Sequence, residues 1–130
     1  MTKVILNETY FTKDHEWVFP IEDKALVGIS DYAQKNLGDV VFVELPTEGQ
    51  TFAQHEACCV LESVKAASEV FIPLSGTIAS VNLSLEDDPG QINSEPYAKG
   101  FLFTIRDFDK EELKSLMSFK EYENFIKEEG

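Results

Sequence analysis

The sequence predicts a mainly β domain, a compact sandwich or flattened barrel with a short internal helix and helices at its C-terminus. Its 130 residues, 43% of them hydrophobic, suit a single domain with one modest core. Short apolar segments recur between turns rich in Pro, Gly and acidic residues, as in an all-β protein. Helical spacing of apolar residues is clearest in the tail. We therefore treat residues 1–130 as one domain, with residues 109–129 as a helical C-terminal appendage.

The first half of the chain predicts strands at residues 15–19, 25–29 and 40–45. We expect Pro20 to end the first strand. Pro46 stops the third, which is almost continuously apolar and is therefore expected to be buried. Ser30 can cap a short helix over Asp31–Leu37, which Gly38 ends.

The second half predicts strands at residues 58–61, 70–72, 77–83 and 101–105. Residues 85–97 hold acids, two prolines and a glycine, and they predict a long irregular connection with one helical turn. Asp109 caps an expected helix over residues 110–117, and Ser118 begins another, with Glu121 completing a capping box. We expect one face of this last helix to dock on the sheet; its members are Phe119, Tyr122, Phe125 and Ile126.

The formal net charge of −13 argues against binding to nucleic acid or to an anionic membrane. It either steers the protein toward basic surfaces on partner proteins or only keeps it dispersed. The adjacent Cys58 and Cys59 would point to opposite faces of a strand, so we expect two thiols that act as small core residues in a reducing compartment. His15 and His55 lie far apart in sequence and suggest no metal site.

Several functional signals are missing from the sequence. Residues 1–8 contain neither a secretory apolar segment nor an Arg- and Ser-rich transit segment, and no stretch reaches the length of a membrane span. We therefore expect a bacterial cytoplasmic protein, or a mitochondrial matrix protein whose presequence has been removed. There is no Gly-rich phosphate loop, G-x-S-x-G elbow or H-E-x-x-H motif. This favours a non-catalytic carrier or binding module whose hard chemistry would be supplied by a cofactor.

The most informative stretch is a small polar centre between the apolar runs at residues 58–61 and 70–72. It predicts a β-hairpin with Lys65 at its exposed tip, where small neighbours leave the amine open to a modifying enzyme. An ordinary solvated lysine that discourages edge aggregation fits the same pattern. Gly76, in the turn that follows, can take a positive φ.

The segment Glu62-Ser63-Val64-Lys65-Ala66-Ala67-Ser68 resembles the lipoylation motif of the glycine cleavage system H protein family. Further motifs in the family's order extend the resemblance over most of the chain: His15-Glu16-Trp17-Val18, Gly28-Ile29-Ser30-Asp31-Tyr32-Ala33-Gln34, Leu37-Gly38-Asp39-Val40-Val41-Phe42-Val43-Glu44-Leu45-Pro46 and Asn93-Ser94-Glu95-Pro96-Tyr97. The resemblance implies the barrel-sandwich hybrid fold of lipoyl and biotinyl carriers. It also implies that lipoate forms an amide with Lys65, which would change the formal charge from −13 to −14.

The resemblance also implies a set of partners. In this family the lipoyl arm accepts an aminomethyl group when glycine is decarboxylated by a pyridoxal-phosphate enzyme, glycine decarboxylase (P protein). The arm presents that group to a tetrahydrofolate-dependent aminomethyltransferase (T protein) and is reoxidised by dihydrolipoamide dehydrogenase (L protein). A lipoate ligase or lipoyltransferase attaches the arm. We expect a monomer that serves these proteins.

The residues that the resemblance places at the cofactor are Lys65, Glu62, Ser63, Ser68 and Gly76. Glu62 would orient the hairpin or be read by the ligase, Ser68 would keep the tip solvated, and Gly76 would let the backbone fold tightly beneath the hairpin. A loaded arm is expected to rest on a surface that includes Asp31, Tyr32, Asp88 and residues 93–97.

The chain departs from the family's pattern at three places. Cys59 and His55 stand where the family usually has glycine, and Lys99-Gly100-Phe101 stands where it tends to have tryptophan after Gly-x-Gly. Two alternatives therefore stay open: an H-like protein that mainly donates lipoyl groups to other lipoyl domains, and an unmodified acidic interaction module. A biotin carrier would have methionine on both sides of the lysine, and a 2-oxoacid dehydrogenase lipoyl domain would have aspartate at Val64.

Overall fold

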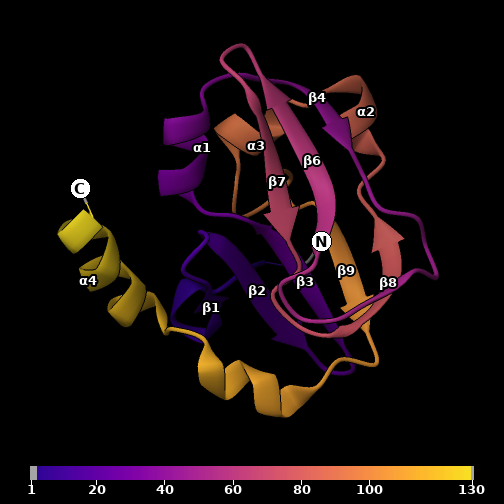
Figure 1. Cartoon of the computed structure of the whole chain (residues 1–130), viewed down its shortest axis with the longest axis vertical. Helices are drawn as coiled ribbons and strands as arrows, with labels where there is room; N and C mark the ends of the chain where they lie inside the picture. The colour runs from indigo at the N-terminus through magenta and orange to yellow at the C-terminus, as the bar shows by residue number, and fades with distance from the viewer. Residues whose placement is uncertain (1–2, 130) are drawn as a thin grey trace.

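A computed structural model describes residues 3–129 as two antiparallel sheets with short helices around them (Figure 1). The larger sheet has six strands in the order β1-β2-β3-β9-β8-β5, and the smaller has three in the order β4-β6-β7. The strands of the larger sheet are β1 (Tyr10–Phe11), β2 (Glu16–Ile21), β3 (Lys24–Ile29), β5 (Thr51–Phe52), β8 (Gly76–Val81) and β9 (Phe103–Arg106). Those of the smaller sheet are β4 (Val40–Glu44), β6 (Ala57–Ser63) and β7 (Ala67–Phe71). The predicted mainly β architecture is confirmed.

The prediction that Pro20 ends its strand is wrong. Strand β2 continues to Ile21, and Pro20 pairs with Ala25 of β3. Proline is tolerated here because β1 pairs only with Trp17 and Val18, so the edge of β2 beyond them needs no N–H donor.

The predicted strand over residues 40–45 exists, but it is only partly buried. Val41 and Phe42 have 55% and 52% of their surface exposed. A β-bulge shifts the pairing of β4 with β6 between Val40 and Phe42, which changes the face toward which the following side chains point. An apolar run alone does not reveal such a shift.

The predicted caps of the internal helix are confirmed. Helix α1 spans Asp31–Leu37, and the hydroxyl of Ser30 accepts a hydrogen bond from the amide of Ala33 at 3.1 Å. Gly38 ends the helix with a φ of 82°, in the left-handed region that glycine adopts without strain.

The remaining helices follow the prediction in outline. The connection over residues 85–97 contains two short helices rather than one turn, α2 (Ser84–Asp87) and α3 (Gln91–Ser94). The helix after Asp109 is a 3₁₀-helix, η2 (Lys110–Ser115), and a shorter one, η1 (Leu6–Glu8), precedes β1. Helix α4 (Phe119–Glu129) begins with the predicted capping box: the Ser118 amide donates to the Glu121 carboxylate at 2.8 Å, and the Glu121 amide donates to the Ser118 hydroxyl at 3.1 Å.

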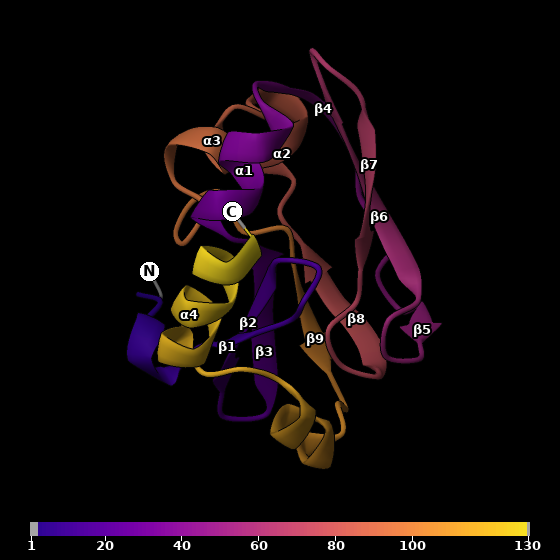
Figure 2. The ribbon, with the colours of Figure 1, turned by 60° about the vertical axis from the view of Figure 1, so that its left-hand side comes forward.

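The hydrophobic side chains form two clusters on opposite faces of the larger sheet. Alternation along β2 directs Val18 into the main cluster, between the two sheets, and Trp17 and Phe19 into the other. Helix α4 covers this second cluster, where the rings of Tyr122 and Phe11 stack at 4.4 Å between centroids. Figure 2 shows α4 and the N-terminal segment on one side of the molecule, with β6 and β7 on the other. The predicted docking of α4 on the sheet is confirmed.

No helix within residues 3–129 combines the length and the apolar character needed to span a bilayer.

Candidate functional site

The predicted hairpin is confirmed, and Lys65 is exposed in the turn at its tip. Ser63 organises this turn. Its amide donates to the carbonyl of Ala66 at 2.8 Å. Its hydroxyl accepts hydrogen bonds from the amides of Lys65 and Ala66 at 3.1 and 3.2 Å and donates to the Ala66 carbonyl. These bonds fix the backbone from which the lysine projects.

The side chain of Lys65 lies over the C-terminal end of α1. Its Nζ donates to the carbonyl oxygen of Asn36 at 3.3 Å, and its Cε is 3.2 Å from the position that a Cβ on Gly38 would occupy. The last carbonyls of a helix attract a cation, so this is a favourable position for the ammonium group. Gly38 leaves room for the stem of the lysine in addition to ending the helix.

Asn93 ties the surroundings of the tip together. Its side-chain amide donates to the carbonyl of Gly38 at 2.8 Å and to the side chain of Gln34 at 3.0 Å, while its Oδ1 accepts from the amide of Val40 at 2.9 Å. The amide of Val64 also donates to the carbonyl of Asp39 at 3.0 Å. Asn93 therefore joins α3, α1 and β4 beneath the hairpin. The sequence predicted residues 93–97 only as part of a resting surface for the arm. The role of Asn93 in holding these elements together was missed, because it depends on contacts between segments that are far apart in the sequence.

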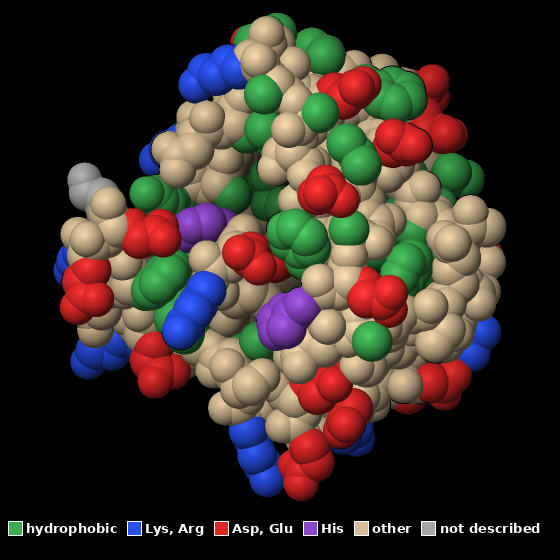
Figure 3. Space-filling model, in the orientation of Figure 1, with side chains coloured by type: hydrophobic (Ala, Val, Ile, Leu, Met, Phe, Trp, Pro, Cys, Tyr) green, Lys and Arg blue, Asp and Glu red, His purple; other side chains and the backbone are tan. Residues whose placement is uncertain are grey.

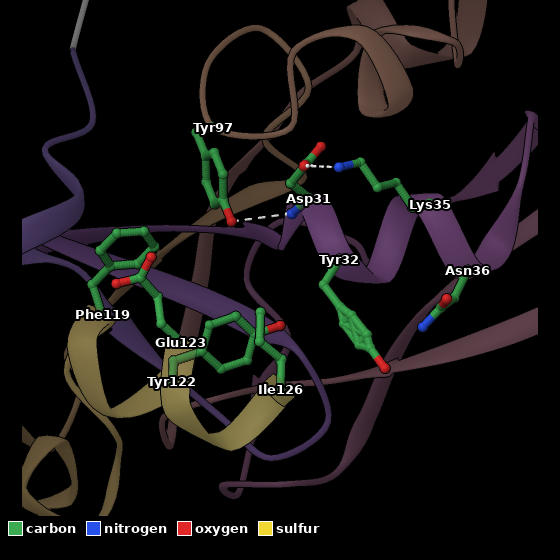
Figure 4. A pocket seen from close by; sticks show the side chains of 9 residues that line it. All are labelled: Asp31, Tyr32, Lys35, Asn36, Tyr97, Phe119, Tyr122, Glu123 and Ile126. Carbon is green, nitrogen blue, oxygen red and sulfur yellow. Dashed lines mark hydrogen bonds and ion pairs between the residues drawn. The ribbon is translucent and has the colours of Figure 1, made fainter. Parts of the chain in front are cut away.

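A pocket of about 480 Å³ lies between α1, α4 and Tyr97 (Figure 4). Its lining consists of Asp31, Tyr32, Lys35, Asn36, Tyr97, Phe119, Tyr122, Glu123 and Ile126. Asn36 connects this pocket to the lysine, because it lines the pocket and its carbonyl oxygen accepts the hydrogen bond from Lys65, which lies outside the lining. Of the residues expected at the resting surface, Asp31, Tyr32 and Tyr97 line this pocket, whereas Asp88 and residues 93–96 lie outside the lining. The apolar contribution of α4 to the pocket was not predicted.

Asp31 lines this pocket and is held in place by several interactions. Its amide donates to the hydroxyl of Tyr97 at 3.1 Å, and its carboxylate accepts from Gln34 at 2.9 Å and pairs with Lys35 at 3.0 Å. The hydrogen bond from Gln34, followed by the one from Lys35, lowers the pKa of Asp31. Asp31 therefore stays ionised at neutral pH.

Glu16 is a buried acid between the two sheets, with 2% of its surface exposed. Its carboxylate accepts a hydrogen bond from the hydroxyl of Thr12 at 2.6 Å and another from the amide of Phe71, at the end of β7, at 3.2 Å. Burial raises its pKa to about 7, although both hydrogen bonds act in the opposite direction. Glu16 thus links the start of β2 to the base of the lysine hairpin.

The other sequence-predicted site residues divide into two groups. Glu62 and Ser68 are exposed on the two strands of the hairpin, close to Lys65 in the chain. Gly76 begins β8 instead and lies beside β9, at the end of the hairpin away from the tip (Figure 1). The expected positive φ at Gly76 is wrong: within residues 3–129, the glycines with positive φ are Gly38 and Gly49. Glycine is required at position 76 because a Cβ there would overlap the side chain of Ile105 and lie 2.9 Å from the carbonyl oxygen of Arg106.

Replacing Gly76 with alanine is expected to destabilise the fold by about 2 kcal/mol through overpacking against β9. Gly90→Ala is the matched control, because the nearest atom to its added Cβ would be the Asp88 carboxylate at 3.5 Å. Urea unfolding of both variants measures the difference. Equal stability of the two variants would contradict the packing explanation.

The two cysteines are free thiols that serve as packing residues. Cys59 is buried, with 4% of its surface exposed, and Cys58 is half-buried. Burial raises the pKa of Cys59 to about 12 and raises that of Cys58 as well. Both are therefore protonated and unreactive at neutral pH. Within residues 3–129, no cluster of three or more His, Cys, Asp or Glu residues could hold a metal ion.

Comparison with known proteins gives a consistent picture. The family model described as "Glycine cleavage H-protein" matches residues 9–129. The glycine cleavage system H protein of Halothermothrix orenii is 51% identical over 118 residues, covering 91% of this chain and 92% of the relative. That of Thermus thermophilus is 43% identical over 126 residues, covering 97% and 98%. The crystal structure of a glycine cleavage system H protein from Mycobacterium marinum superposes with a TM-score of 0.82 at 35% identity, covering 92% of this chain and 97% of that one. The chain belongs to the glycine cleavage H-protein family.

Proposed function

We propose that this chain is the lipoyl carrier of a glycine cleavage system, with lipoate joined by an amide bond to Lys65. The observation that carries the proposal is the exposed amine of Lys65 at the tip of a two-stranded hairpin. The chemistry of this position fits the group: amide formation needs an accessible primary amine, and the neighbours Ala66, Ala67 and Ser68 are small. When bound, lipoate supplies a dithiolane that accepts the aminomethyl group of glycine and carries it between active sites.

The residues around Lys65 would position the arm and give it a place to rest. The Ser63 hydroxyl holds the turn, and the Asn36 carbonyl and Gly38 form the surface beneath the lysine stem. We propose that the adjoining pocket is the resting surface of the loaded arm. Its aromatic walls, Tyr32 and Tyr97, exclude water from an apolar chain, while Asp31 supplies a negative charge that attracts an amine.

We propose four partners for this carrier: glycine decarboxylase, aminomethyltransferase, dihydrolipoamide dehydrogenase and a lipoate ligase or lipoyltransferase. A tether at Lys65 raises the effective concentration of the carried group at each active site. The formal charge of −13 favours encounters with basic surfaces on these enzymes. Because the similar proteins come from bacteria, we propose that the protein works in the bacterial cytoplasm.

Reconstitution tests this function. The lipoylated chain is incubated with purified glycine decarboxylase, glycine and labelled bicarbonate, and incorporation of label into glycine is followed. Label should enter glycine only when the lipoylated chain is present. A lipoylated chain that supports no exchange, but passes its lipoyl group to another lipoyl domain, would contradict the proposal and establish the donor role instead.

A further inference from the structure

Large apolar side chains are exposed beside the lysine hairpin. Within residues 3–129, five large hydrophobic residues are exposed, and three of them are Val41 at 55%, Phe42 at 52% and Val64 at 69%. Single exposed apolar residues are ordinary, but a group of them in one region marks an interaction surface. We call these three residues, together with Glu44, Glu62 and Glu69, the docking face.

The backbone directs these side chains outward. A regular strand would alternate between buried and exposed positions, so Val41 and Phe42 would point to opposite faces. Because the pairing shifts between Val40 and Phe42, Val41 becomes the extra residue, and Val41 and Phe42 are both exposed while Val40 stays buried. Bulges re-aim side chains in this way near functional sites. Val64 lies beside the start of this strand, since its amide donates to the Asp39 carbonyl at 3.0 Å.

The docking face is continuous with Lys65 and acidic. Phe42 pairs with Glu62 across β4 and β6, and Val60 pairs with Glu44 on one side and with Glu69 on the other. The three strands β4, β6 and β7 contain these three glutamates and no Lys or Arg. Figure 3 shows acidic and hydrophobic side chains interleaved over this sheet. A complementary surface would be apolar at its centre and basic at its rim.

We infer that the docking face binds the enzyme that acylates Lys65, through an apolar patch bordered by Lys and Arg residues. The acylating enzyme reacts with Nζ of Lys65 itself. Its active site must therefore come within the length of one lysine side chain of the hairpin tip, where it must contact Val64 and the residues around it. Enzymes that act on the dithiolane at the far end of the lipoyl-lysine arm need not contact the hairpin tip. This inference rests on the proposed function, and it adds Val41 and Phe42 to the residues that decide how well the chain is modified.

The test compares two variants that lose exposed apolar surface at different places, one on the docking face and one away from it. The double variant Val41→Thr, Phe42→Thr removes apolar surface from the docking face but keeps residues with high β-propensity. Ile5→Thr is the control, because Ile5 is 46% exposed and lies in the N-terminal segment on the opposite side of the molecule (Figure 2). Each protein is incubated with a purified bacterial lipoate ligase, lipoate and ATP. Lipoate and ATP first form lipoyl-AMP and release pyrophosphate. The Nζ amine then attacks the carboxyl carbon, the bond from that carbon to the AMP oxygen breaks, AMP leaves, and the Lys65 ammonium group gives up two protons in forming the amide.

The kcat/KM of acylation, measured by intact mass, should fall about tenfold in the double variant and stay unchanged in Ile5→Thr. Acetylation of Lys65 by a small amine-reactive ester should be equal in all three proteins, showing that the amine and the fold are intact. Enzymatic acylation of the double variant at the wild-type rate would overturn the inference while leaving the proposed function in place. A wild-type chain that the ligase does not modify would overturn the proposed function itself. A dimer that the double substitution dissociates, with no change in acylation rate, would assign the face to a second copy and overturn the inference.

Discussion

Lys65→Arg is expected to abolish lipoylation of this chain and, with it, all glycine–bicarbonate exchange. Arginine keeps the positive charge and can still donate to the Asn36 carbonyl, but its guanidinium group stays protonated and does not form the amide. Because residue 65 is exposed, stability should change by no more than about 0.5 kcal/mol. Exchange assays after treatment with ligase, together with urea unfolding, measure both expectations.

Lys114→Arg is the control for this substitution. Lys114 lies on η2, where it pairs with Glu111 at 2.8 Å, and it lies outside the lining of the pocket. Its replacement should leave lipoylation and exchange intact. Exchange by the Lys65→Arg variant at a measurable rate would show that the carried group is attached elsewhere.

The stability of the protein is expected to fall between about pH 5 and pH 8 because of Glu16. Burial raises its folded-state pKa from 4.5 to about 7, so the folded chain holds this proton more tightly than the unfolded chain does. The resulting stabilisation is fully present below pH 4.5 and is lost as the pH rises through 7. The size of the loss is about 3 kcal/mol from this group alone.

Urea unfolding of the wild type and of Glu16→Gln across this pH range isolates the contribution. Glutamine has nearly the same shape but does not titrate, so the difference in unfolding free energy between the two proteins should change by about 3 kcal/mol between pH 5 and pH 8. Glu62→Gln removes an exposed acid and should leave the pH dependence as it is in the wild type. A difference between wild type and Glu16→Gln that is constant with pH would contradict the raised pKa.

Local signals in the sequence predicted much of this fold. The apolar runs on either side of Lys65 identified the hairpin, and Ser30 and Ser118 identified the starts of α1 and α4, because strand propensity and helix capping act over a few residues. The exposed position of Lys65 followed from the same local pattern. The structure confirms these features. They were predictable because contacts with distant parts of the chain do not change them.

Features that depend on contacts between distant parts of the chain could not be predicted from the sequence. The bulge that exposes Phe42 depends on how β4 pairs with β6, and the clamp formed by Asn93 depends on where α3 meets α1. The sequence predicted that position 76 needs glycine, but for the wrong reason. Glycine is needed because β9 leaves no room for a Cβ, and not because the residue has a positive φ. The pocket between α1 and α4 could not be predicted without the docking position of α4.

One departure from the family's pattern now has a physical explanation. His55 occupies a turn where glycine is usual, and its φ is 72°, in the region that glycine adopts most easily. The backbone of this turn therefore keeps a glycine-like conformation although the residue has changed. The departure leaves the hairpin that starts just after it intact.

Peptide mapping of the lipoylated wild-type chain tests the central claim most directly. After treatment with ligase, lipoate and ATP, the protein is digested and its peptides are weighed by mass spectrometry. One lipoyl increment per chain should appear, on the peptide that contains Lys65. An increment on any other lysine, or none at all on the Lys65 peptide, would contradict the assignment of this hairpin as the carrier site.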